Sequence, residues 1–213
     1  MKTDDLIHML ARNDAPVDLH ALKKRFTIAM LIAALAATLL ATMWLGVRPD
    51  IAIAAKTPLF WLKGALPATL ALGALWMATR LSRPGVPAGI SWWGVVVPIA
   101  AVWGGASYVL AQAAPDARLS LILGQTWSVC PLLIALLSIP GFIAIFAAIK
   151  GLAPTRLRLA GATGGLLSGA IATLAYCVHC PEMGVPFWAC WYVLGMLIPT
   201  ALGALLGPRF LRW

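Results

Sequence analysis

The chain is poor in charged residues. Only 11% of its 213 residues are Asp, Glu, Lys or Arg, and 62% are hydrophobic. Soluble domains are typically about 25% charged and about 45–50% apolar. This scarcity of charge excludes an ordinary soluble domain, a disordered chain and a coiled-coil rod. A mean hydropathy of +0.90 indicates instead a polytopic membrane protein.

Long stretches of the chain carry no charge at all. A helix needs about 20 residues to cross about 30 Å of hydrocarbon, and neither of the two longest stretches can hold two such helices. The shortest stretch, 64–79, reaches this length if its helix starts at Leu59 and Lys63 extends toward the lipid headgroups. We therefore predict an all-α fold with six transmembrane helices, near 26–47, 59–79, 90–111, 128–149, 158–177 and 187–207.

The ends of the chain are expected on one side of the membrane. The first 25 residues are polar and the first apolar stretch is a full-length helix, so we expect no cleavable signal peptide. With six spans, twelve of the sixteen Lys and Arg residues fall on the side that holds both termini. The positive-inside rule then predicts cytoplasmic termini, and basic loops in contact with lipid. We divide the chain into a cytoplasmic tail, 1–25, and a transmembrane bundle, 26–213.

The tail is the longest polar segment, and no larger domain is present to carry a nucleic-acid site. Leu6, Ile7 and Leu10 form an apolar face of a short amphipathic helix. Such a helix can lie on the membrane surface or in a groove of a partner protein. Because Asp4 and Asp5 would be repelled by an anionic leaflet, a protein partner suits this tail better.

Glycines recur at a spacing of four residues in the last two predicted helices. They are Gly161, Gly165 and Gly169 in one helix, and Gly203 and Gly207 in the other. Small residues at this spacing let membrane helices approach closely. We expect packing within the bundle; the same motif is compatible with a homodimer, which no other feature favours.

All four cysteines fall on the predicted outer side. Cys130 lies at the outer end of the fourth helix, and Cys177, Cys180 and Cys190 bracket the last outer loop. Thiols outside the cytoplasm can be oxidised or bind metal, whereas cytoplasmic thiols stay reduced. This cluster is therefore the candidate chemical site. We expect the neighbouring Glu182 to be a solvated loop residue.

The residues leave several kinds of thiol site open. In one, Cys130 and Cys180 form a pair that is oxidised or bridged by a metal. In a second, Cys177, His179 and Cys180 bind Zn(II) or Cu(I), with Cys130 or Cys190 completing the ligand set. In a third, the Cys177–Cys180 CxxC exchanges disulfides with Cys130 and Cys190. A structural disulfide is the plainest alternative.

At this point the chain resembles the NrsF-type membrane anti-sigma factors of proteobacteria. The resemblance rests on the opening Met1–Ile7, on six spans over the whole length, and on Cys180-Pro181-Glu182 with the aromatic residues that follow, Phe187, Trp191 and Tyr192, and Gly195. Members of this family hold an extracytoplasmic-function sigma factor at the bacterial inner membrane. They release it under stress, when outer cysteines detect a heavy metal or an oxidant.

The resemblance also assigns roles to residues. It implies that Cys130 and Cys180 are the paired cysteines of the family, and that Cys177 and Cys190 are additions. It implies a sigma-binding segment that contains Asp4, Asp5, Leu6, Ile7 and Leu10. No resident cofactor is required, although the thiols could hold a zinc or copper ion.

Two other functions compete with this regulatory reading. Four outer cysteines with a CxxC also fit a quinone-linked membrane thiol-disulfide oxidoreductase, but an acidic, partner-like tail has no use in such an enzyme. A metal transporter is the other alternative. Pumps and many transporters need a charged residue within the membrane, and no predicted span has one near its centre. We therefore expect a regulator rather than an enzyme.

Overall fold

The computed structural model describes residues 3–5, 7 and 20–212, and the regular structure within them is entirely helical. Six helices are long and apolar enough to cross a membrane. The predicted all-α class and the predicted number of candidate spans are therefore confirmed. The spans are Ala21–Leu45, Pro58–Leu81, Gly89–Gln112, Cys130–Lys150, Leu157–Tyr176 and Val185–Phe210.

Several spans are made of more than one helical segment. Three are single α-helices: α4 (Pro58–Leu81), α7 (Cys130–Lys150) and α8 (Leu157–Tyr176). The others combine α2 (Ala21–Leu40) with a π-helical turn (Ala41–Leu45), a 3-10 turn (Gly89–Trp92) with α5 (Trp93–Gln112), and α9 (Val185–Phe187) with a π-helical turn (Trp188–Tyr192) and α10 (Val193–Phe210). Two short helices, α3 (Ile51–Ala54) and α6 (Pro115–Leu123), connect spans.

The first helix begins before its apolar stretch does. α2 starts at Ala21 and includes the charged residues Lys23 to Arg25. Lys and Arg favour helix as strongly as most apolar residues do. The helix can therefore begin within the charged segment, several residues before the hydrophobic stretch begins. Of the predicted sigma-binding segment, Asp4, Asp5 and Ile7 are helical and exposed, whereas Leu6 and Leu10 lie outside the described residues.

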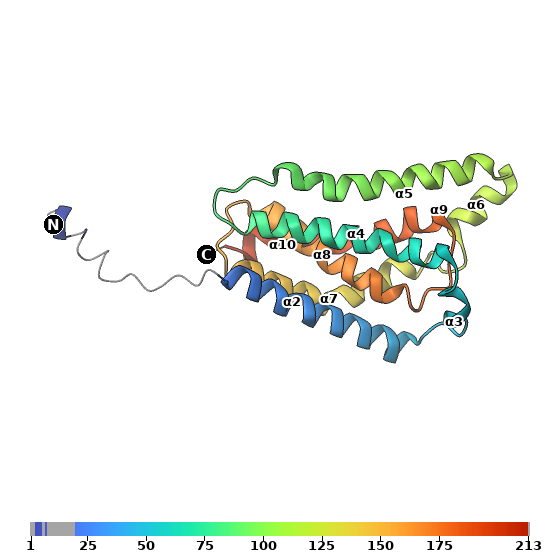
Figure 1. The fold of residues 1–213 in the computed structure, drawn as a ribbon, viewed down its shortest axis with the longest axis horizontal. Helices are drawn as coiled ribbons and strands as arrows, with labels where there is room; N and C mark the ends of the chain where they lie inside the picture. The colour runs from blue at the N-terminus through green and yellow to red at the C-terminus, as the bar shows by residue number, and fades with distance from the viewer. Residues whose placement is uncertain (1–2, 6, 8–19, 213) are drawn as a thin grey trace.

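The bundle has two chemically different ends. Figure 1 shows the C-terminus and the start of α2 at one end, and α3, α6 and α9 at the other. We call these the terminal end and the thiol end, because Cys130 follows α6 and Cys180 precedes α9. Among residues 20–212, the three acids Asp50, Asp116 and Glu182 all belong to connections at the thiol end.

Helix α8 is the centre of the bundle. In the most apolar 18-residue segment of α8, 83% of the residues are buried inside the protein. The corresponding share for the span that contains α5 is 6%. It packs against α10, α7, α4 and α2, and its sequence LRLAGATGGLLSGAIATLAY is rich in small residues. A helix that is surrounded on every side needs small side chains, because they let neighbouring backbones come close.

The predicted glycine ladder brings α8 and α10 together. A Cβ atom on Gly161 would overlap the backbone of Gly203, and one on Gly165 would overlap the carbonyl of Pro199. Gly207 in turn faces the carbonyl of Leu157. The motif is therefore used within one chain, as predicted, to join the last two spans.

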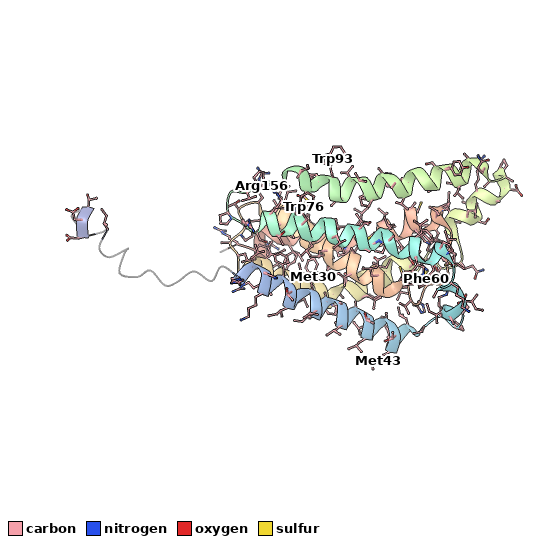
Figure 2. The ribbon with its side chains drawn as sticks, in the orientation of Figure 1. Met30, Met43, Phe60, Trp76, Trp93 and Arg156 are labelled. Carbon is pink, nitrogen blue, oxygen red and sulfur yellow. The ribbon has the colours of Figure 1, made fainter. Side chains whose placement is uncertain are left out.

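The outside of the bundle is apolar. Figure 2 shows Met43 on the outer side of α2 and Trp93 on the outer side of α5, where 83% and 62% of their surfaces are exposed. Soluble monomers rarely expose apolar surface on this scale. A lipid environment around the bundle explains it, because lipid chains are as apolar as these side chains.

The close approach of α8 and α10 leads to a stability prediction. Gly165→Ala places a methyl group against the Pro199 carbonyl, and overpacking of this kind costs about 1–3 kcal/mol. We expect the free energy of unfolding in detergent micelles, followed by Trp fluorescence, to fall by that amount. Gly104→Ala is the control, because nothing lies within 4 Å of its added Cβ; equal effects of the two variants would contradict the assigned packing.

Candidate thiol site at the end of the bundle

Three of the four cysteines meet inside the thiol end. Cys130 is the first residue of α7, Cys177 follows the last residue of α8, and Cys180 lies in the loop before α9. Their exposed fractions are 0%, 5% and 0%, and all three thiols are free. Burial raises the pKa of Cys177 to about 11, so this thiol is protonated and unreactive at neutral pH.

Two tyrosines complete a buried polar cluster with these thiols. Tyr176, at the end of α8, and Tyr192, just before α10, are 1% and 0% exposed, and their ring centroids are 6.0 Å apart. The Tyr176 hydroxyl lies against the thiols of Cys130 and Cys180. The Tyr192 hydroxyl is the one buried side-chain oxygen or nitrogen of the described residues without a hydrogen-bond partner, although the thiol of Cys180 is adjacent.

Lys63 points into this cluster instead of toward the lipid headgroups. Its side chain is 0% exposed, and its Nζ donates a 2.6 Å hydrogen bond to the carbonyl of Cys180. The same Nζ lies 5.7 Å from the centre of the Tyr192 ring, in cation–π range. The expected outward extension of Lys63 was therefore wrong, because the carbonyl and the ring offer the ammonium an inward site.

Arg48 approaches the same carbonyl from the connection between α2 and α3. Its Nη1 donates to the Cys180 carbonyl at 3.2 Å, and its backbone N–H donates to the Val178 carbonyl, also at 3.2 Å. The guanidinium also forms a bidentate pair with Asp50, with both N–O distances 2.7 Å. This pairing lowers the pKa of Asp50 and raises that of Arg48. The loop around Cys180 is thus fixed from two directions.

His179 is engaged with the backbone rather than with the thiols. Its Nδ1 lies 3.0 Å from the carbonyl of Gly46, and its ring centroid is 5.7 Å from that of Tyr176. A carbonyl can only accept, so Nδ1 carries the proton in this arrangement. The contact ties the residue after the first π-helical turn to the cysteine loop, and leaves only Nε2 as a ligand atom.

Glu182 joins the two segments that carry Cys130 and Cys180. Its Oε1 accepts hydrogen bonds from the backbone N–H groups of Gln125 and Thr126, at 2.6 and 3.2 Å. These residues lie in the turn that leads into Cys130 and α7. Glu182 is a loop residue of intermediate exposure, as expected, but its carboxylate is not merely solvated, because the turn before α7 presents two backbone donors to it.

Cys190 stands apart from the other thiols. It lies in the π-helical turn before α10 and is exposed, whereas Trp188 and Tyr192 of the same turn are buried. The second pair of the disulfide-exchange hypothesis, Cys130 and Cys190, is thus divided between a buried and an exposed position.

The arrangement does not fit a bound metal ion as it stands. Within residues 3–5, 7 and 20–212, no three His, Cys, Asp or Glu side chains converge in a geometry that could hold a metal. The candidate ligands Cys130, Cys177, Cys180 and His179 share one end of the bundle, but His179 faces Gly46. A zinc or copper site at these residues stays a prediction that requires the cluster to rearrange.

Sequence reasoning found the cysteines but missed their polar surroundings. Lys63, Arg48, Tyr176 and Tyr192 were not recognised as parts of the site. The one signal for Lys63 in the sequence is its charge within an otherwise apolar span, since charged residues in membrane helices are uncommon and often functional. The tyrosines resemble any other interfacial aromatic residue.

Comparison with known proteins identifies the class of protein. Residues 10–213 match the family described as "Negative regulator of sigma F". A probable anti-sigma-F factor NrsF of Azospira oryzae is 47% identical over 218 residues, and an anti-sigma-F factor NrsF of Caulobacter vibrioides is 36% identical over 214 residues. Both comparisons cover the whole of each chain.

These matches place the chain among anti-sigma factors, which are regulators of transcription. It belongs to the NrsF family of anti-sigma factors, as the resemblance predicted. No solved structure matches it.

The bridge made by Glu182 can be tested through thiol accessibility. Glu182→Ala removes the acceptor of two backbone N–H groups, and hydrogen bonds to a charged group are worth about 1.5–3 kcal/mol each. In a variant that keeps Cys180 as its one cysteine, we expect maleimide labelling of Cys180 to become at least about tenfold faster.

Matched variants separate the bridge from a general charge effect. Glu182→Gln keeps a neutral acceptor, and we expect an intermediate labelling rate. Asp116→Asn removes an exposed acid in the first turn of α6, at the same end of the bundle, and should leave the rate unchanged. A wild-type rate in Glu182→Ala would show that the carboxylate does not hold the loop.

Proposed function

We propose that this chain holds an extracytoplasmic-function sigma factor of the sigma-F type at the bacterial inner membrane. Its N-terminal tail binds the sigma factor in the cytoplasm, without direct contact between this chain and nucleic acid. A heavy-metal ion or an oxidant that reacts with the thiols at the periplasmic end of the bundle causes release. The three buried free thiols at the end opposite the tail carry this proposal.

The distribution of charge supports this orientation. Among residues 20–212, the terminal end holds ten of the fourteen Lys and Arg residues, and all three acids belong to the thiol end. Basic residues near membrane helices favour the cytoplasmic side and attract anionic lipid. The orientation puts the tail where sigma factors act and the thiols where oxidants and metals arrive.

The chemistry of the thiol cluster supports a sensor that is inactive at rest. Cys130, Cys177 and Cys180 are buried and free, and thiols rather than thiolates are poor nucleophiles and poor metal ligands. A soft metal ion that reaches the cluster gains thiolate ligands that suit it. Binding therefore favours a rearranged cluster over the closed one, and this difference in affinity is what can shift the bundle between two states.

The tail supplies the other half of the proposal. Asp4, Asp5 and Ile7 are exposed and helical, which leaves them accessible to a partner. A short amphipathic helix that inserts its apolar face into a groove is a common way to bind a protein. We assign the binding segment to Asp4, Asp5, Leu6, Ile7 and Leu10.

Sigma binding is tested on the full chain by changing the apolar face of the tail. Leu6→Ser combined with Leu10→Ser removes two apolar side chains that would anchor the helix in a groove of the partner. We expect at least about a tenfold loss of sigma factor co-purified from detergent-solubilised membranes. His8→Ser, on the opposite face of the expected helix, should co-purify normal amounts. Undiminished co-purification by the double variant would contradict the assignment.

Thiol sensing is tested with a sigma-dependent reporter in cells exposed to cadmium chloride or diamide. We expect Cys130→Ser and Cys180→Ser to abolish induction by both reagents, because each removes one member of the proposed pair. Cys190→Ser is the matched control and should leave induction at the wild-type level, since that thiol is exposed and separate. Normal induction in Cys130→Ser and Cys180→Ser would refute thiol sensing and leave sigma binding unaffected.

A further inference from the structure

Lys63 is a buried cation that the proposed thiol chemistry does not use. It is the sixth residue of α4 and is 0% exposed. Charged side chains near the end of a membrane helix usually extend to the headgroups. This one turns inward, and removing an ammonium from water is costly unless its protons are satisfied.

The compensation comes mainly from the cysteine loop. Among the described residues, the salt bridge at this end joins Arg48 to Asp50, and no acidic side chain pairs with Lys63. Nζ of Lys63 instead donates to the Cys180 carbonyl at 2.6 Å and lies over the ring of Tyr192. The burial of Lys63 therefore depends on where the backbone of Cys180 lies.

The side chain has a second place to go. The neighbouring Trp61 is 67% exposed, and its indole N–H donates to the carbonyl of Ala55 at 2.9 Å, as expected of an aromatic residue at the membrane interface. Lys56, at the same end, is exposed. Lys63 thus starts close enough to the headgroups to reach them if the Cys180 carbonyl no longer holds it.

We propose that Lys63 is the positioning residue through which the thiol cluster controls helix α4. At rest, its hydrogen bond to the Cys180 carbonyl holds the start of α4 against the cysteine loop. When Cys180 takes up a soft cation, its backbone moves, and the ammonium loses its acceptor. Lys63 then leaves the interior and the start of α4 moves with it. This inference rests on the proposed thiol sensing.

Helix α4 is suited to carry such a movement. It runs from the thiol end to the terminal end (Figure 1) and packs on the central helix α8. At the terminal end, the connection after α4 reaches the one after α7, where the Gly85 N–H donates to Thr155 Oγ1 at 3.4 Å. A shift of α4 therefore affects the end of the bundle at which α2 begins.

The test replaces Lys63 with Met, which fills a similar volume but cannot donate. Exchange of a buried cation for an apolar group of similar shape is often tolerated, and protein abundance in membranes checks that it is here. We expect the sigma-dependent reporter to rise at least about tenfold without cadmium, because α4 is no longer held to the Cys180 loop. Lys56→Met, an exposed lysine at the same end, is the control and should leave the reporter repressed.

Combined variants separate a positioning role from a space-filling one. Lys63→Gln keeps an N–H donor without the charge and should restore part of the repression that Lys63→Met loses; equal derepression in the two variants would refute the role of the hydrogen bond. Lys63→Met combined with Cys180→Ser should stay derepressed and insensitive to cadmium, because Lys63 acts after the thiols. Repression in that double variant would refute this order.

Failure of this inference differs from failure of thiol sensing. If Lys63→Met reaches wild-type abundance and still represses and responds to cadmium as the wild type does, the role of Lys63 is refuted while thiol sensing stands. If Cys130→Ser and Cys180→Ser respond normally to cadmium, thiol sensing itself fails, and control of α4 through Cys180 fails with it.

Discussion

The thiol end depends on one backbone oxygen, the carbonyl of Cys180. Lys63 of α4 and Arg48 of the connection after α2 both donate to it, so three parts of the chain that are distant in sequence meet at one acceptor. A buried ammonium is tolerated only where its protons are satisfied. Movement of this carbonyl would therefore affect Lys63 and Arg48 together, which is a physical basis for a cooperative change.

The packing of the centre determines how closely this end can assemble. Gly161 and Gly165 let α8 and α10 approach to backbone contact, and Tyr176 and Tyr192 at the ends of these helices are brought to 6.0 Å. The tyrosines then enclose the thiols, and the closed cluster keeps Cys177 protonated at neutral pH. The close contact of α8 and α10 thus helps to bring together the two tyrosines that cover the thiols.

The thiol cluster and the start of α2 lie at opposite ends of the bundle. Helix α2, which follows the tail in sequence, begins at one end of the bundle and the thiols occupy the other (Figure 1), so any signal received at the thiols would have to pass through the helices to reach that end. The central helix α8 touches α2, α4, α7 and α10. A change in the position of any one of them is therefore felt by the others, because closely packed interiors do not deform freely.

The amino-acid sequence alone determined the helical class, the six candidate spans, the glycine contact between the last two helices and the gathering of the cysteines at one end. These features follow from hydropathy and spacing, which are local properties of the chain. Only the tertiary structure decided that Lys63 turns inward, that Glu182 bridges two loops, and that Cys190 is exposed while Cys130 is buried. These outcomes depend on how each helix is rotated about its axis and on which backbone groups a distant loop leaves free, and no local pattern encodes either.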